Sequence, residues 1–138
     1  MGTPLITLDT SGLLAALNRG DRHHQTVVRS LEQETGPLVL PVALLGEAGY
    51  MVEGWLGSST LRRLLSDMMA GFYVLDCGEH DLSRIDALLA RYEDLRLGFA
   101  DACVIACAER NGGRVLTTDR RHFGVVAREQ TIEIVPPL

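Results

Sequence analysis

LITLDTSGLLAAL, residues 5–17, joins a predicted buried strand to the helix that follows it. The apolar, β-branched start is typical of a strand inside a sheet, and Leu13, Leu14 and Leu17 repeat at helical spacing. Asp9 lies between the two elements. Because the carboxyl ends of parallel strands face the ligand crevice of an open sheet, Asp9 is a candidate for chemistry. A helix-capping role for Asp9 is the structural alternative.

Strand-like and helix-like segments alternate along the chain, which predicts an α/β fold with a central parallel sheet of about five strands flanked by helices. The length of 138 residues, of which 46% are apolar, fits a single domain over residues 1–138. The segment 98–110 is apolar nearly all round and is expected to be central. Strands are expected near residues 5–8, 38–40, 72–75, 114–117 and 132–135, and helices near 13–17, 21–34, 42–56, 60–70, 79–91 and 98–110.

Targeting and membrane segments are not expected. The chain has no basic leader region, and Asp9 interrupts its first apolar run, so neither a secretory signal nor a membrane-spanning helix is predicted. We therefore expect a cytoplasmic location and no membrane partner. The three cysteines, Cys77, Cys103 and Cys107, form no Cys-x-x-Cys pair, which argues against a disulfide framework and a thiolate zinc site.

The acidic balance of the chain lowers the expectation of a nucleic-acid partner. The net charge is −5 and the isoelectric point is about 5.3. However, all 13 basic residues are arginines, whose planar guanidinium groups can bind a phosphate through two hydrogen bonds. Acidic side chains gathered around a divalent metal would also be neutralised there. A genome rich in arginine codons is an alternative explanation for the arginine content.

Three further acids share an unusual setting with Asp9. Glu47 interrupts an apolar helical stripe, Asp101 lies in the first turn of the most apolar helix, and Asp119 ends a buried strand. A carboxylate near a core is costly unless it is paired, and no arginine is expected on the same faces. Each acid also has a structural alternative, as a helix-dipole partner, a turn or cap residue, or an exposed side chain.

A cluster of carboxylates suits Mg²⁺ or Mn²⁺, which take oxygen ligands and keep several waters. Such an ion can activate a water for attack on a phosphodiester, so no protein general base is required. No histidine is expected at this site, in keeping with that chemistry.

These acids and their surroundings resemble the PIN-domain pattern, most closely that of VapC-type toxins of bacterial toxin–antitoxin systems. The resemblance implies a PIN-like three-layer sandwich and a metal-dependent endoribonuclease, commonly aimed at tRNA or rRNA. The matching segments are LDTS at 8–11, LGEA at 45–48, GFADA at 98–102 and LTTDRRHF at 116–123.

The resemblance also assigns roles to individual residues. Those expected to be catalytic and to hold Mg²⁺ or Mn²⁺ are Asp9, Glu47, Asp101 and Asp119. Thr117 matches a hydroxyl position of the family, and Ser11 and Asp94 are further candidates for contacts to the metal ligands. Arg120 and Arg121, beside Asp119, are the best candidates for contacts to RNA.

The family resemblance further implies a homodimer and a small cognate VapB-type antitoxin. Such an antitoxin commonly lays a segment into a groove near the third and fourth helices. These helices carry more apolar residues than one small core needs, and large exposed apolar patches mark interaction sites. Packing in the core is the alternative explanation. The residues concerned are Met51, Trp55, Leu64, Met68 and Met69.

Other α/β enzymes with an acid after the first strand fit less well. Haloacid-dehalogenase-like phosphotransferases need a second Asp where this chain has Ser11. Both these enzymes and response-regulator receivers use a lysine, and the chain has none. The remaining alternative is a non-catalytic PIN-like module that binds RNA or protein.

Overall fold

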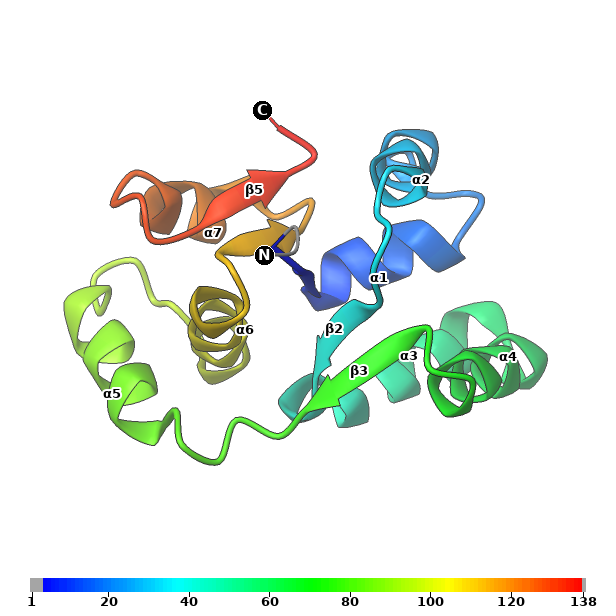
Figure 1. Cartoon of the computed structure of the whole chain (residues 1–138), viewed down its shortest axis with the longest axis horizontal. Coiled ribbons are helices and arrows are strands. Elements are labelled where there is room, and N and C mark those ends of the chain that lie inside the picture. The colour runs from blue at the N-terminus through cyan, green and yellow to red at the C-terminus, as the bar shows by residue number, and fades with distance from the viewer. Residues whose placement is uncertain (1–3, 138) are drawn as a thin grey trace.

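Five parallel strands form one sheet in the computed structural model, which describes residues 4–137 (Figure 1). Their order across the sheet is β3-β2-β1-β4-β5, so the first strand is central. All four neighbouring pairs are parallel, as the alternating sequence pattern predicts. The strands are β1 (Ile6–Leu8), β2 (Leu38–Pro41), β3 (Tyr73–Asp76), β4 (Arg114–Leu116) and β5 (Glu133–Val135).

Helices cover both faces of this sheet. In Figure 1, α5 and α6 lie on one side, α1 and α2 lie on the other, and α3 and α4 form a hairpin beside β3. None of the helices in residues 4–137 has the length and apolar character needed to cross a membrane. The helices are α1 (Thr10–Leu17), α2 (His24–Glu32), α3 (Leu45–Leu56), α4 (Ser58–Met69), α5 (Leu82–Arg91), α6 (Phe99–Arg110) and α7 (Arg120–Ala127), with a 3-10 turn at Val42–Leu44.

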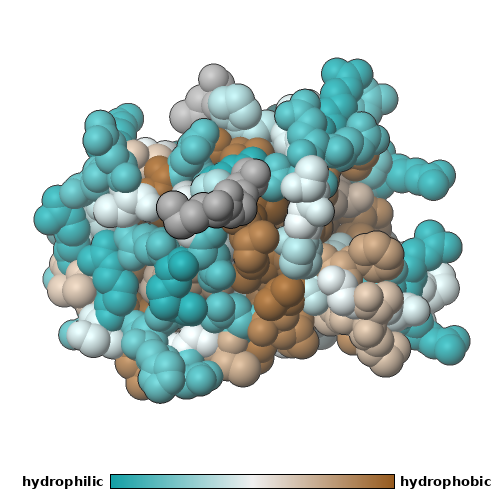
Figure 2. Space-filling view, viewed as in Figure 1, coloured by the Kyte–Doolittle hydropathy of each residue, from teal (hydrophilic) through white to brown (hydrophobic). Residues whose placement is uncertain are grey.

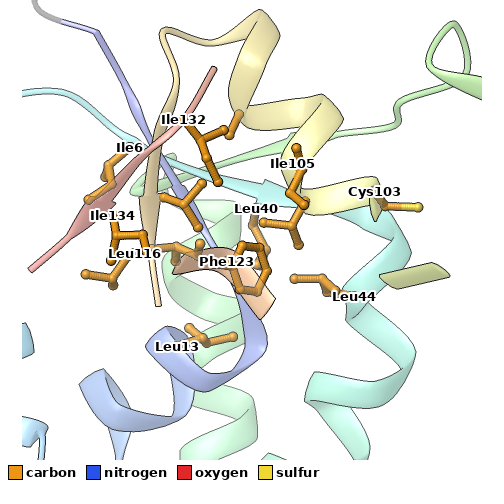
Figure 3. Packing of buried hydrophobic residues seen from close by; sticks show 14 of the residues in the cluster. Ile6, Leu13, Leu40, Leu44, Cys103, Ile105, Leu116, Phe123, Ile132 and Ile134 are labelled. Carbon is orange, nitrogen blue, oxygen red and sulfur yellow. The ribbon is translucent and has the colours of Figure 1, made fainter. Parts of the chain in front are cut away.

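The core is centred on α6, which packs against β1, β2 and β4. Every residue from 102 to 108 of this helix is buried, as its apolar composition predicts. Figure 3 shows how Ile105 of α6 faces side chains from the strands, among them Leu40 and Leu116. Phe123 of α7 is fully buried in the same cluster. The helix that carries Asp101 is therefore fixed by packing along its length.

One helix is missing from the sequence expectation, and several helix ends differ from it. The sequence does not predict α7, because the pattern after Asp119 is short and offers only Phe123 and Val126 as fully buried residues. The helices expected over 21–34, 42–56 and 79–91 begin at His24, Leu45 and Leu82. Asp81 precedes it and is buried, where it accepts two hydrogen bonds from the guanidinium group of Arg110 at 2.6 and 2.7 Å.

The strand order brings β1 and β4 together at the centre of the sheet, where the chain direction across the sheet reverses. Ligands of open α/β sheets bind at such a point, beyond the carboxyl ends of the strands. Gly12 allows α1 to approach the end of β4, because a Cβ at this position would overlap the carbonyl oxygen of Leu116. That same oxygen accepts a hydrogen bond from the Asp9 backbone N–H at 3.0 Å.

We expect Gly12→Ala to lower the free energy of unfolding by about 1–3 kcal/mol, the usual cost of overpacking a tight contact. The matched control is Gly54→Ala, in α3, where an added Cβ meets open space. Because alanine favours helix over glycine, this control should be neutral or stabilising by up to about 1 kcal/mol. Urea unfolding of both variants tests the pair, and equal stabilities would contradict the role given to Gly12.

Candidate metal-dependent active site

A cleft of about 340 Å³ opens at the carboxyl ends of β1 and β4. The structure brings all four acids singled out in the sequence to this cleft: Asp9, Glu47, Asp101 and Asp119. They come from four different elements, which meet only through the strand order. That these four acids catalyse a reaction and bind a metal ion stays a prediction.

Asp9 is the most buried of the four acids, with 6% of its surface exposed. Its Oδ2 accepts hydrogen bonds from Ser11 Oγ at 2.8 Å and from Thr117 Oγ1 at 2.9 Å. Burial raises the pKa of Asp9, the two hydroxyl hydrogen bonds lower it, and the charge of Asp101 raises it. The protein thus holds a carboxylate at this position at an electrostatic cost.

Ser11 and Thr117 also connect the ends of the two central strands. Ser11 Oγ accepts from the backbone N–H of Thr118 at 3.0 Å, and Thr117 Oγ1 accepts from that of Asp119 at 2.9 Å. Each hydroxyl therefore receives one hydrogen bond from the β4 side and donates one to Asp9. This network fixes the position of Asp9 relative to the loop that carries Asp119.

Asp101, Asp119 and His122 form a second group, in which one ligand atom of each residue lies within 4.8 Å of the others. Asp101 is half-buried in the first turn of α6. Burial raises its pKa first, His122 lowers it, and the charges of Asp119 and Glu47 raise it. Asp101 and Asp119 thus lie close enough to repel each other.

Comparisons with known proteins identify this arrangement. A family model described as "PIN domain" matches residues 6–129. The chain belongs to the PIN-domain family. It is 30% identical over 121 residues to ribonuclease VapC26 of Mycobacterium tuberculosis (strain ATCC 25618 / H37Rv), covering 86% of this chain and 90% of the relative. The VapC-type resemblance expected from the sequence is thereby confirmed.

The fold of this PIN domain is also found in a solved structure. The crystal structure of VapC20 from Mycobacterium tuberculosis, a sarcin-ricin loop cleaving toxin, superposes with a TM-score of 0.75 at 20% sequence identity. The match covers 87% of this chain and 94% of that protein. At this identity the likeness supports the PIN-like three-layer fold alone.

His122 is a residue of the site that the sequence did not indicate, and the expectation of no histidine there is wrong. Asp119 caps α7 by accepting from the backbone N–H groups of Arg121 and His122 at 3.1 and 3.2 Å. His122 Nδ1 lies 3.1 Å from Asp119 Oδ2. A capping Asp followed three residues later by a polar residue was the available signal, since capping pairs recur at this spacing.

Glu47 differs from the other acids of the PIN domain because its side chain is exposed. It lies in the first turn of α3 and lines the cleft. The expectation of a carboxylate buried near the core is therefore wrong for Glu47, although its charge still contributes to raising the pKa of Asp101.

The remaining predicted residues lie at different distances from the cleft. Ser11 and Thr117 contact Asp9 directly. Asp94 is exposed in the turn after α5, and it does not belong to the residues that line the cleft in the described part of the chain. Arg120 and Arg121 are exposed at the start of α7, outside the cleft lining but next to Asp119.

The donors of this site fit a hard divalent cation. Burial raises the pKa of the Asp9 carboxyl group, and it raises that of Asp101 as well. A cation at the cleft would relieve both effects, and carboxylate oxygens are the ligands that Mg²⁺ and Mn²⁺ prefer. His122 lies within hydrogen-bond distance of the Asp119 carboxylate and so could orient it as a candidate ligand.

We expect Asp9→Asn to stabilise the protein in EDTA at neutral pH by about 0.5–2 kcal/mol, the range of single stabilising substitutions. Because the folded-state pKa of Asp9 is raised, its protonated form contributes stability at low pH, which is lost as the pH rises through that pKa. The advantage of Asn should therefore shrink on acidification.

Thermal unfolding from pH 4 to pH 8 measures this difference. Adding Mn²⁺ should raise the midpoint of the wild type and have a smaller effect on Asp9→Asn, since ligands that bind the folded state stabilise it. A variant less stable than the wild type at every pH would contradict the electrostatic cost assigned to Asp9.

Proposed function

We propose that this PIN domain is a metal-dependent endoribonuclease of the VapC type and the toxin of a toxin–antitoxin pair. The observation that carries the proposal is the meeting of Asp9, Glu47, Asp101 and Asp119 in one cleft. Family membership and the similarity to ribonuclease VapC26 support the nuclease class. RNA is then the substrate, and the cytoplasm is the place of action.

The four acids would hold Mg²⁺ or Mn²⁺ in this proposal. The bound ion supplies a lowered pKa for an attacking water and neutralises negative charge that develops on the phosphodiester. The residues of the chain keep the ligands in place: Ser11 and Thr117 hold the Asp9 carboxylate, and His122 holds that of Asp119. Glu47 faces them from α3 and is available as a ligand from the open side of the cleft.

Structured RNA, such as tRNA or rRNA, is the substrate class we propose. VapC20, which shares the fold, is a toxin that cleaves the sarcin-ricin loop. A cleft that opens at the surface and is lined by the acids suits an exposed RNA loop better than the interior of a duplex, because loops present phosphates and bases without a paired strand.

The proposed protein partners are a VapB-type antitoxin and a second copy of the chain. Trp55 and Met69 of the α3–α4 hairpin are exposed, at 67% and 82%, whereas Leu64 is buried and belongs to the core. Hydrophobic surface also gathers over β2 and β3 on the face seen in Figure 2, where Val74 and Leu75 of the edge strand are exposed. Such surfaces are typical of interaction sites.

We expect Asp101→Asn to reduce RNA cleavage by about 100-fold or more, since it removes one charge from the group that would hold the metal. The matched control is Asp86→Asn, an exposed residue of α5, which should keep full activity. Both variants and the wild type are incubated with total cellular RNA in Mg²⁺, Mn²⁺ or EDTA.

Discrete products that require metal and Asp101 would support the nuclease. If folded wild-type protein, free of antitoxin, cleaves no RNA with either metal, the alternative becomes correct, namely a non-catalytic module that binds RNA or protein. Full activity of Asp101→Asn would remove this residue from the mechanism.

We expect the double variant Arg120→Ala/Arg121→Ala to bind RNA more weakly and with a smaller dependence on salt. For each phosphate that the variant no longer neutralises, the slope of log affinity against log salt should fall by roughly 0.7. Arg29→Ala, on α2, serves as the control for the removal of an exposed cation. An unchanged affinity and slope would show that α7 does not contact the RNA backbone.

A further inference from the structure

One face of α3 lines the cleft that holds the acids. Glu47, Met51 and Trp55 line the cleft and follow each other at intervals of four residues, so they share this face. Eight residues of helix advance about 12 Å, which separates Trp55 from Glu47 by two turns. The wall therefore leads from the acids at one end to an indole at the other.

The cleft offers nucleic acid no cationic side chain within the described residues. Five of its lining residues are acidic: Asp9, Asp21, Glu47, Asp101 and Asp119. The rest are neutral, so attraction of the phosphate chain inside the cleft would come from a bound metal ion. Any further affinity for RNA in this place must come from contacts to uncharged groups, which means the bases or the sugars.

Trp55 is the only aromatic side chain among the described residues that line the cleft. An isolated exposed apolar residue needs no explanation by itself. Trp55, however, is both exposed over 67% of its surface and one of the residues that line the cleft with the acids. Aromatic side chains next to a nucleic-acid path stack on bases, and they do so with little regard to sequence because every base has a π-face.

We propose that Trp55 is a base-stacking subsite, which holds an unpaired base of the RNA within about four nucleotides of the cleaved phosphate. The span follows from the roughly 12 Å along α3 and the roughly 3.4 Å between bases of a stacked strand. Met51, between Trp55 and Glu47, adds an apolar surface beside the same base. This inference rests on the nuclease function proposed above and makes Trp55 a positioning residue.

The subsite restricts the substrate class further. A base can stack on Trp55 only when it is unpaired or has left its helix, so cleavage next to unpaired nucleotides is favoured over cleavage within a duplex. A segment of protein is the competing occupant of the same indole. We favour the RNA base because Trp55 lines the cleft with the acids, where the substrate has to lie.

Fluorescence tests the contact directly, because Trp55 is the only tryptophan of the chain. The protein is the Asp101→Asn variant of the 138-residue chain in Mg²⁺. The probes are a labelled single-stranded ten-nucleotide RNA, the same strand as a duplex, and the same strand with all bases removed. We expect the base-containing single strand to quench the tryptophan emission, with much weaker quenching by the other two.

Anisotropy of the labelled RNA measures binding in parallel and does not require cleavage. Binding without quenching, or no binding of the single strand, would overturn the stacking subsite. Equal quenching by the strand without bases would do so too. Because the readout is binding, its failure is distinguishable from an absence of nuclease activity in the wild type.

Variants supply the second arm. Trp55→Leu should weaken binding of the single strand about fivefold or more, whereas Trp55→Phe, which still stacks, should weaken it less. The matched control is Tyr50→Leu, an 81%-exposed aromatic on the same helix that does not line the cleft, and it should bind as the parent does. Equal effects of Trp55→Leu and Tyr50→Leu would contradict the proposal.

Kinetics with single abasic positions locate the base. For an RNA that the wild type cleaves, Trp55→Leu should raise KM more than it lowers kcat. If the RNA lacks the base that stacks on Trp55, Trp55→Leu should no longer raise KM, because the variant and the missing base remove the same contact. The position should lie within about four nucleotides of the cut, and additivity at every position tested would overturn the assignment.

Discussion

Burial of carboxylates close to one another is the constraint on which the site depends. Burial raises the pKa of Asp9, the charge of Asp101 adds to this effect, and no arginine is among the described residues that line the cleft. The fold holds the Asp9 carboxylate with short hydrogen bonds from neutral donors. The hydroxyls of Ser11 and Thr117 both donate to Asp9, while the backbone around β4 donates to those hydroxyls. The close packing allowed by Gly12 keeps the two strand ends near enough for this network.

Packing in the core offsets the destabilisation caused by the clustered acids. Asp101 stands on α6, whose following seven residues are all buried, so the backbone cannot move away to relieve the repulsion. Asp119 is fixed in a different way, as the cap of α7, which is anchored by the fully buried Phe123. Active sites of this kind usually lower the stability of the free protein, and it is regained when a ligand binds.

The sequence predicts most of the fold because each strand and its helix have a local pattern. The alternation of elements, the central place of α6 and the carboxylate after β1 follow from residues 5–17 and 98–110. The meeting of Asp9 with Asp119 depends on β4 lying beside β1, which no local pattern specifies, so only the family resemblance indicated it. His122 was missed because the apolar pattern of α7 is too short to predict a helix there. The exposure of Glu47 depends on how α3 is rotated against α1, which the sequence does not specify.

The absence of a cation among the side chains that line the cleft in the described residues also bears on turnover. A nuclease that gripped its substrate there with arginines would grip the cleaved strands equally well, because both carry phosphates. In this cleft, the five acidic residues would repel the negatively charged ends of the cleaved strands. The same acidity that makes substrate entry costly would therefore speed release of the products, so that one protein molecule could act on many RNA molecules.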